Sequence, residues 1–102
     1  MTKVIRVARD FSRTPAGRRR EDGPFSGERF RKEVLEPALR EHHRVVVDLD
    51  GTAGYGSSFL EEAFGGLLRD GFTPEALKRR LRFRAADTSL IEEIREYCRM
   101  GG

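Results

Sequence analysis

VVVDLDGTAGYGSSFLEEAFGGLL, at residues 45–68, decides the fold of this chain. Three successive valines and an aspartate are typical of the end of a buried strand. A polar, glycine-rich turn follows, and apolar residues then recur at the three- and four-residue spacing of a helix. Such a unit brings backbone N–H groups and polar side chains to one edge of a sheet, where ligands and partners bind. We therefore place the candidate site in this turn.

The sequence on either side predicts further strands. Residues 3–8 are rich in β-branched residues, and residues 81–85 alternate between apolar residues and arginines. Both patterns are typical of strands, and the strict alternation predicts that the second of them has one face in water. The valines at 45–47 predict a central strand that is buried on both faces.

Helix start signals occur through the rest of the chain. A serine with a glutamate three residues later fits a capping box at Ser58 and again at Ser89. The first predicted helix covers residues 27–43, is capped by Ser26 and has a kink at Pro37. The second runs from residue 57 or 58 to Gly71. A short helix follows Thr73, and a last helix begins at Ser89. This order predicts one α/β domain over residues 1–102, with a long basic loop at residues 10–27.

Length and composition limit what the chain can be. Its 102 residues suffice for one modest core. No apolar run has the length of a membrane span, and residues 1–12 lack the apolar segment of a signal peptide. The single cysteine, Cys98, cannot form an internal disulfide and is expected in the core as a small apolar residue. We expect a cytoplasmic protein that contacts no membrane.

Basic residues are clustered, although the net charge is only +3. One cluster lies in the loop at residues 10–27 and a second at residues 78–84. Such clusters attract phosphates, nucleic acid or acidic proteins. Nucleic acid is disfavoured, because neither interleaved aromatic residues nor a helix-turn-helix pattern accompanies the charge. Arg18 and Arg19 are candidates for holding an anion if their loop folds over the turn at residues 55–58; otherwise they are solvated.

Asp48 and Asp50, in the string DLDGT, resemble the first motif of haloacid-dehalogenase-type phosphatases. There the first aspartate is a nucleophile and Mg²⁺ lies between the carboxylates, so the resemblance implies a small Mg²⁺-dependent phosphotransferase. After Thr52, however, the chain has one lysine and two isolated aspartates, too few for that family's metal site. The alternative is an aspartate that binds turn amides. With one cysteine and two adjacent histidines, we expect no metal site and no cofactor.

Ser57 and Ser58 follow the flexible turn Gly54-Tyr55-Gly56 and stand where a helix is predicted to begin. An accessible serine there can accept a phosphate, which would meet free backbone amides and the positive end of the helix dipole. Glutamates in the first helical turn would oppose that phosphate. Capping of the helix by a serine hydroxyl explains the same residues without any function.

Two segments, residues 17–39 and 45–68, resemble the STAS-like domain of unknown function (DUF4325 type) and cover most of the chain. This family is related to the STAS domains of bacterial anti-sigma-factor antagonists, whose motif D-L-S-x-V-x-x-x-D-S-S/T-G follows a central strand. A histidine-kinase-type ATPase phosphorylates one serine of that motif. Asp48 matches the first aspartate, and Ser57 and Ser58 match the serine pair. Gly56 replaces the second aspartate and Phe59 replaces the glycine.

The resemblance implies a single STAS-like α/β domain with a mixed β-sheet and helices packed mainly on one face. It implies a non-enzymatic regulatory module with a phosphoserine switch, and a histidine-kinase-like ATPase as the first partner to test. We expect that partner on the turn and on a helix face made of Glu61, Glu62, Gly65 and Gly66. The glycine pair lowers helix stability, which close approach of another backbone offsets, either inside the domain or in a homodimer.

Overall fold

Three short strands form a parallel sheet in the computed structural model, which describes residues 1–101. They lie side by side in chain order, and both neighbouring pairs are parallel. Their bounds are Thr2–Arg6 for β1, Arg44–Asp48 for β2 and Leu81–Arg84 for β3. The α/β prediction is confirmed, but the predicted mixed sheet is wrong in the described part of the chain. Helical connections return the chain to the same end of the sheet after each strand, which makes both pairings parallel.

The long helix of the first connection has a π-helical turn in its middle. It consists of α2 (Gly27–Phe30), the π-helical segment η2 (Arg31–Leu35) and α3 (Glu36–Glu41). Ser26 caps it as predicted, since its hydroxyl accepts a hydrogen bond from the Arg29 amide at 3.2 Å. The π-helical turn comes just before Pro37, which has no amide proton to donate. The disturbance expected from this proline therefore takes the form of a wider turn.

The second connection contains two helices. The first runs through α4 (Ser57–Leu60), the π-helical segment η3 (Glu61–Gly65) and α5 (Gly66–Arg69), and the second is α6 (Pro74–Arg80). Thr73 caps α6 as predicted, with its hydroxyl accepting from the Ala76 amide at 3.1 Å. The capping box predicted at Ser58 is wrong, because Gly56 occupies the cap position and has no side chain to bond the first amides.

The remaining helices are short or lie at the end of the chain. They are α1 (Val7–Asp10), the 3-10 helical turn η1 (Arg20–Asp22) and α7 (Thr88–Tyr97). β1 is shorter than predicted because the chain turns into α1 directly after Arg6. The capping box predicted at Ser89 is also wrong, since the Asp87 carboxylate caps α7 by accepting from the Ser89 amide at 3.0 Å. No helix among residues 1–101 has the length and apolar character needed to cross a membrane.

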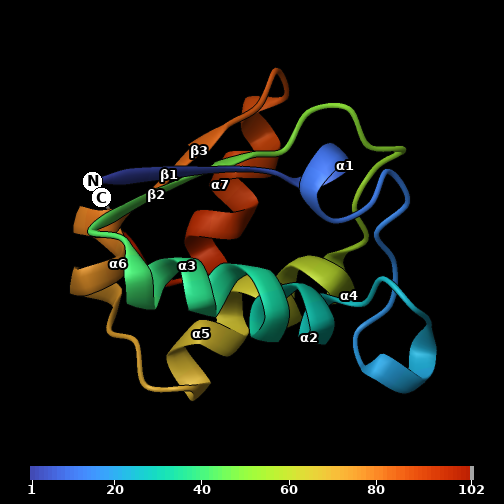
Figure 1. Ribbon diagram of the computed structural model, residues 1–102, viewed down its shortest axis with the longest axis horizontal. Coiled ribbons are helices and arrows are strands. Elements are labelled where there is room, and N and C mark those ends of the chain that lie inside the picture. Colours follow the sequence, from blue (N-terminus) through green and yellow to red (C-terminus); the bar gives the residue numbers. More distant parts are fainter. Residues whose placement is uncertain (102) are drawn as a thin grey trace.

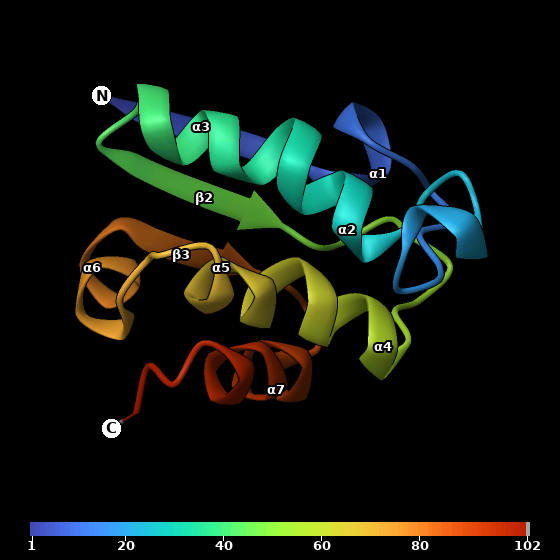
Figure 2. The ribbon, with the colours of Figure 1, turned by 90° about the horizontal axis from the view of Figure 1, so that it is seen from below.

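The helices of both connections cover one face of the sheet, as predicted, and α7 packs beside the second connection (Figures 1 and 2). Val45 and Val47 are fully buried against these helices, whereas Val46 is only half-buried on the opposite face. The prediction that β2 is buried on both faces is therefore wrong, because no described segment covers the second face. Cys98 is buried as expected, and this burial raises the pKa of its thiol to about 12.

Aromatic rings fill the core between the sheet and the helices. The Phe30 and Phe59 rings join the two connections, with centroids 6.1 Å apart. Phe64 meets Phe83 of β3 edge-on at 5.7 Å. The two connections are in tight contact at Gly27, where an added Cβ would lie only 2.5 Å from the Phe59 carbonyl oxygen. The start of the second connection, which carries the candidate serines, is thereby fixed against the first.

Candidate functional site

The turn between β2 and α4 is tied to the loops that follow the other two strands. The Ala53 amide donates a hydrogen bond to the Arg13 carbonyl at 2.8 Å, in the loop after β1 and α1. The Asp50 carboxylate accepts from the Ala86 amide at 2.9 Å, in the loop after β3. These bonds gather three loops at the carboxyl end of the parallel sheet, the edge at which α/β folds place their sites.

Tyr55 anchors this turn from inside. Its hydroxyl donates to the Leu49 carbonyl at 2.8 Å, and its ring packs against Phe59 with centroids 5.9 Å apart. Burial raises the pKa of Tyr55 to about 12, so the hydroxyl keeps its proton and its bond at neutral pH. The flanking Gly54 has a φ of +138°, which side-chain-bearing residues rarely adopt. The predicted site residue Tyr55 therefore holds the shape of the turn.

A shallow hollow of about 330 Å³ opens beside the turn. Its polar lining comes from Asp50, Thr52 and Tyr55 on the turn and from Asp87, Ser89 and Glu93 around the start of α7. All three carboxylates carry local bonds: Asp50 accepts from the Ala86 amide, Glu93 accepts from the Tyr97 hydroxyl, and hydrogen bonds from Ser89 lower the pKa of Asp87. The hollow is acidic, so it does not suit a phosphate or another anion.

Asp48 and Asp50 each bind a backbone amide. An Asp48 carboxylate oxygen accepts from the Asp50 amide at 3.1 Å, while Asp50 itself bonds across to Ala86. Among residues 1–101, no group of three or more histidine, cysteine or acidic side chains is placed to hold a metal ion. The observed geometry is that of the strand-end aspartate that binds turn amides.

Ser57 and Ser58 are both exposed at the start of the long helix after the turn. In the part of the chain that the structure describes, neither hydroxyl makes a hydrogen bond and no side chain caps the helix. The first backbone amides therefore remain available as donors beside both hydroxyls, at the positive end of the helix dipole. These backbone amides would donate hydrogen bonds to a phosphate added to either serine.

Glu61, one turn into the helix, is neutralised by two arginines. The Arg69 guanidinium lies 2.7 Å from one carboxylate oxygen, and the Arg18 guanidinium bonds the other. The bond from Arg69, followed by that from Arg18, lowers the pKa of Glu61. The expected repulsion between this carboxylate and a phosphate is therefore reduced.

The part of the basic loop that carries Arg18 folds against this helix and not over residues 55–58, although Arg13 of the same loop bonds Ala53 of the turn. The middle of the loop is joined to its end through the backbone, since the Gly27 amide donates to the Gly17 carbonyl at 2.9 Å. Arg18 then reaches Glu61, whereas Arg19 stays on the surface. Of the two arginines predicted to hold an anion, Arg18 is already paired with a carboxylate and only Arg19 is exposed.

Three of the four residues of the predicted docking face lie inside the domain, and this part of the prediction is wrong. Glu62 is 2% exposed, and its carboxylate lies 2.8 Å from the Arg31 guanidinium. Gly65 and Gly66 are also buried, and a Cβ on Gly66 would overlap the same guanidinium. The Arg31 side chain lies against Gly66, which explains within the domain why a residue without a side chain stands there. Of the four residues, only Glu61 reaches the surface.

Arg31 is the centre of a buried ion cluster that the sequence analysis missed. The residue is 5% exposed, and its Nε lies 2.9 Å from Asp70 and 3.3 Å from Glu36. One Glu36 carboxylate oxygen is buried without a hydrogen bond among the described residues, and burial raises the pKa of that group. A signal was present, because Arg31 lies one residue after Phe30 and four before Leu35, on the apolar stripe of its helix.

Tyr55→Phe is expected to loosen the turn while leaving the fold intact. Loss of the bond to the buried Leu49 carbonyl should lower the free energy of unfolding by about 1 kcal/mol and speed hydrogen exchange at residues 53–56. Urea denaturation followed by circular dichroism, with exchange measured by NMR, tests this. Tyr97→Phe is the matched control, since the Tyr97 hydroxyl bonds the Glu93 side chain within α7 and not the backbone of the turn. Faster exchange at residues 53–56 in both variants, or in neither, would contradict the anchoring role.

The fold and the turn together define a class of protein: a small α/β domain with a parallel sheet covered on one face and a serine-bearing turn after its central strand. The sequence profile of the family described as STAS-like domain of unknown function (DUF4325) matches residues 26–90, from the Ser26 cap into α7. The chain belongs to this family. Comparisons with curated proteins and with solved structures gave no match.

Proposed function

We propose that this domain is a non-catalytic regulatory module that binds a partner protein through residues 54–58 and the exposed start of α4. The observation that carries the proposal is the pair of exposed serines at an uncapped helix start, on a turn whose Asp50 and Tyr55 side chains are held by hydrogen bonds. A rigid turn that presents free hydroxyls and free amides is suited to recognition and to modification. Membership of a STAS-like family supports the same reading.

Phosphorylation of this serine pair would act on the contact between the helix and the basic loop. Ser57 stands four residues before Glu61, so the two side chains share one face of the helix. A phosphate on Ser57 would therefore compete with Glu61 for the Arg18 guanidinium, which now holds the loop to the helix. The modification would change both the charge of the docking turn and the position of Arg18. A histidine-kinase-like ATPase is the first candidate for the partner and kinase.

Intact-mass analysis of the protein purified from its own host, with identification of any ATPase that elutes with it, tests this proposal. We expect a gain of one phosphate at Ser57 or Ser58, lost in the Ser57→Ala and Ser58→Ala double variant. Ser89→Ala is the matched control, because Ser89 is also an exposed serine in the first turn of a helix but its hydroxyl already bonds Asp87 at 2.6 Å.

The proposal has two parts that can fail separately. If the protein is unmodified and the double variant binds the partner unchanged, the serine turn has no part in the function. Mg²⁺-dependent hydrolysis of a phosphate ester that is lost in Asp48→Asn would overturn the non-catalytic part.

A further inference from the structure

One face of the sheet has no cover among residues 1–101. Figures 1 and 2 show the long helices of both connections on the same side of β1, β2 and β3, with α7 running beside the β3 edge of the sheet. Parallel sheets normally have both faces covered by helices, because their strands have little polar surface to offer to water. We therefore expect a separate partner to cover this open sheet face.

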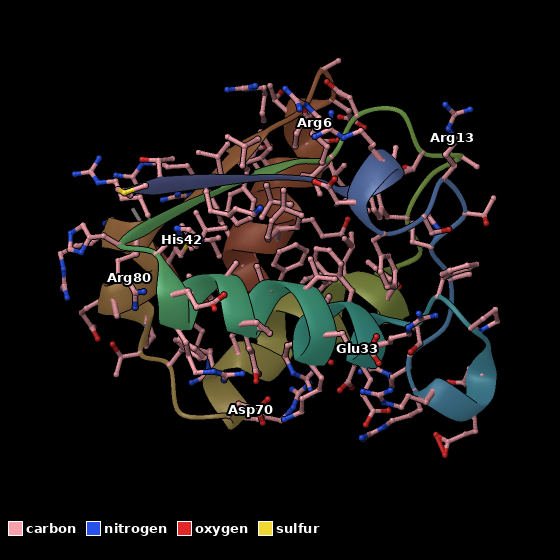
Figure 3. The ribbon with its side chains drawn as sticks, viewed as in Figure 1. Arg6, Arg13, Glu33, His42, Asp70 and Arg80 are labelled. Carbon is pink, nitrogen blue, oxygen red and sulfur yellow. The ribbon has the colours of Figure 1, made fainter. Side chains whose placement is uncertain are left out.

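The strand register assigns the side chains of the open sheet face. Val46 of β2 pairs with Val4 of β1, and both are half-buried on this side. Four arginines surround these valines, one on β1, one on β2 and two on β3: Arg6, Arg44, Arg82 and Arg84. Arg6 lies on the side away from the helices in Figure 3. The face thus has an apolar centre and a basic border.

The charges of this face are not balanced within the domain. Asp48 is its one acidic residue, and it bonds the Asp50 amide of the turn. No carboxylate lies within ion-pair distance of any of the four arginines in the described part of the chain, where Arg29, Arg31 and other arginines do form such pairs. Arg82 donates a hydrogen bond to the Lys78 carbonyl at 2.6 Å. Because a carbonyl oxygen carries no net charge, the positive charge of Arg82 stays uncompensated.

We propose that the open sheet face docks an acidic amphipathic helix of a partner protein. A helix is the element that packs on parallel sheets, its apolar stripe would cover Val4 and Val46, and acidic residues beside that stripe would pair with the arginine border. A second copy is a poor occupant, since two such faces in a symmetric contact would bring arginines against arginines. Nucleic acid fits less well, because the face offers no aromatic side chain for base stacking and has a carboxylate within it.

This docking surface does not depend on the serine turn. Residues 57 and 58 belong to the helix layer on the opposite side of the sheet, whereas the arginines border the uncovered side. A partner helix can therefore occupy the open face whether or not the serines are modified. The Ser57→Ala and Ser58→Ala double variant should bind the helix unchanged.

A labelled peptide of about 20 residues, with leucines on one stripe and glutamates elsewhere, is the probe. The full chain should bind it, increase its helical circular dichroism signal and show NMR amide shifts at residues 2–6, 44–48 and 81–84. The Arg44→Gln and Arg84→Gln double variant should weaken binding at least about tenfold. The matched control is Arg79→Gln with Arg99→Gln, which removes the same charge from exposed arginines elsewhere and should change binding less than about twofold. Arg6→Gln is the single substitution to use if the first pair unfolds the protein.

Four results would overturn the proposal. Equal weakening in the two double variants would mean attraction by net charge alone. Equal binding of a peptide with lysines in place of the glutamates would remove the charge complementarity. Tighter binding of a single-stranded RNA, with steep salt dependence, would assign the face to nucleic acid. Self-association in sedimentation experiments that Arg44→Gln and Arg84→Gln alter would assign it to a second copy.

Discussion

Replacing Arg31 with methionine is expected to lower the free energy of unfolding by about 3–5 kcal/mol. Arg31 is 5% exposed, and its guanidinium compensates the buried carboxylates of Glu62 and Glu36 as well as Asp70. Methionine fills part of the space but leaves those carboxylates buried with less opposing charge, which is the costly way to break a buried ion pair. Urea denaturation followed by far-ultraviolet circular dichroism measures the loss.

The matched control for this prediction is Arg20→Met. Arg20 also pairs with a glutamate, Glu33, at 2.8 Å, but both side chains are about half exposed to water. Its loss should cost less than about 1 kcal/mol. Adding Glu62→Gln to Arg31→Met should recover part of the stability, because one uncompensated carboxylate is removed. If Arg31→Met and Arg20→Met destabilise the protein equally, the buried cluster does not have the importance that its geometry indicates.

Gly27→Ala is expected to lower the free energy of unfolding by about 2–3 kcal/mol. An added Cβ would lie 2.5 Å from the Phe59 carbonyl oxygen and 3.1 Å from the Ala63 amide nitrogen. Both atoms belong to the backbone of the facing helix, so the two helical connections must move apart and loosen the aromatic contacts between Phe30 and Phe59. Because that helix begins with the candidate serines, hydrogen exchange at residues 57–60 should also become faster.

Two other glycine-to-alanine changes distinguish this steric effect on stability from the general effect of alanine on helix propensity. A Cβ on Gly65 would come too close to the carboxylate end of Glu61 alone, which is the end of a flexible side chain, while the Tyr97 carbonyl oxygen stays at 3.6 Å, an ordinary contact. Gly65→Ala should therefore change stability by less than about 1 kcal/mol. Gly66→Ala meets the buried Arg31 guanidinium and should be clearly destabilising. A stabilising effect of Gly27→Ala would show that the contact between the two connections adjusts at little cost.

The location of the candidate site was predictable, whereas its contacts were not. The run of valines followed by DLDGT and a glycine-rich turn placed Asp48 at the end of a central strand and Ser57 and Ser58 after it, where the structure has them. The capping box at Ser58 failed because a capping pattern does not say which residue begins the helix. The prediction of the docking face failed because the Glu62 side chain turns inward and pairs with Arg31, which is distant in the sequence.

Local signals in the sequence by themselves determined the three strands, the four longer helices, the caps at Ser26 and Thr73 and the α/β class of this protein, but not α1. Those features depend on side-chain periodicity and on bonds within a few residues. Only the tertiary structure decided that the sheet is parallel throughout, that one face stays open with its arginines, and that Gly27 and Gly66 are contact points between helices. These features depend on which segments meet across the fold, and neither strand direction nor a partner at long sequence separation is encoded in local periodicity.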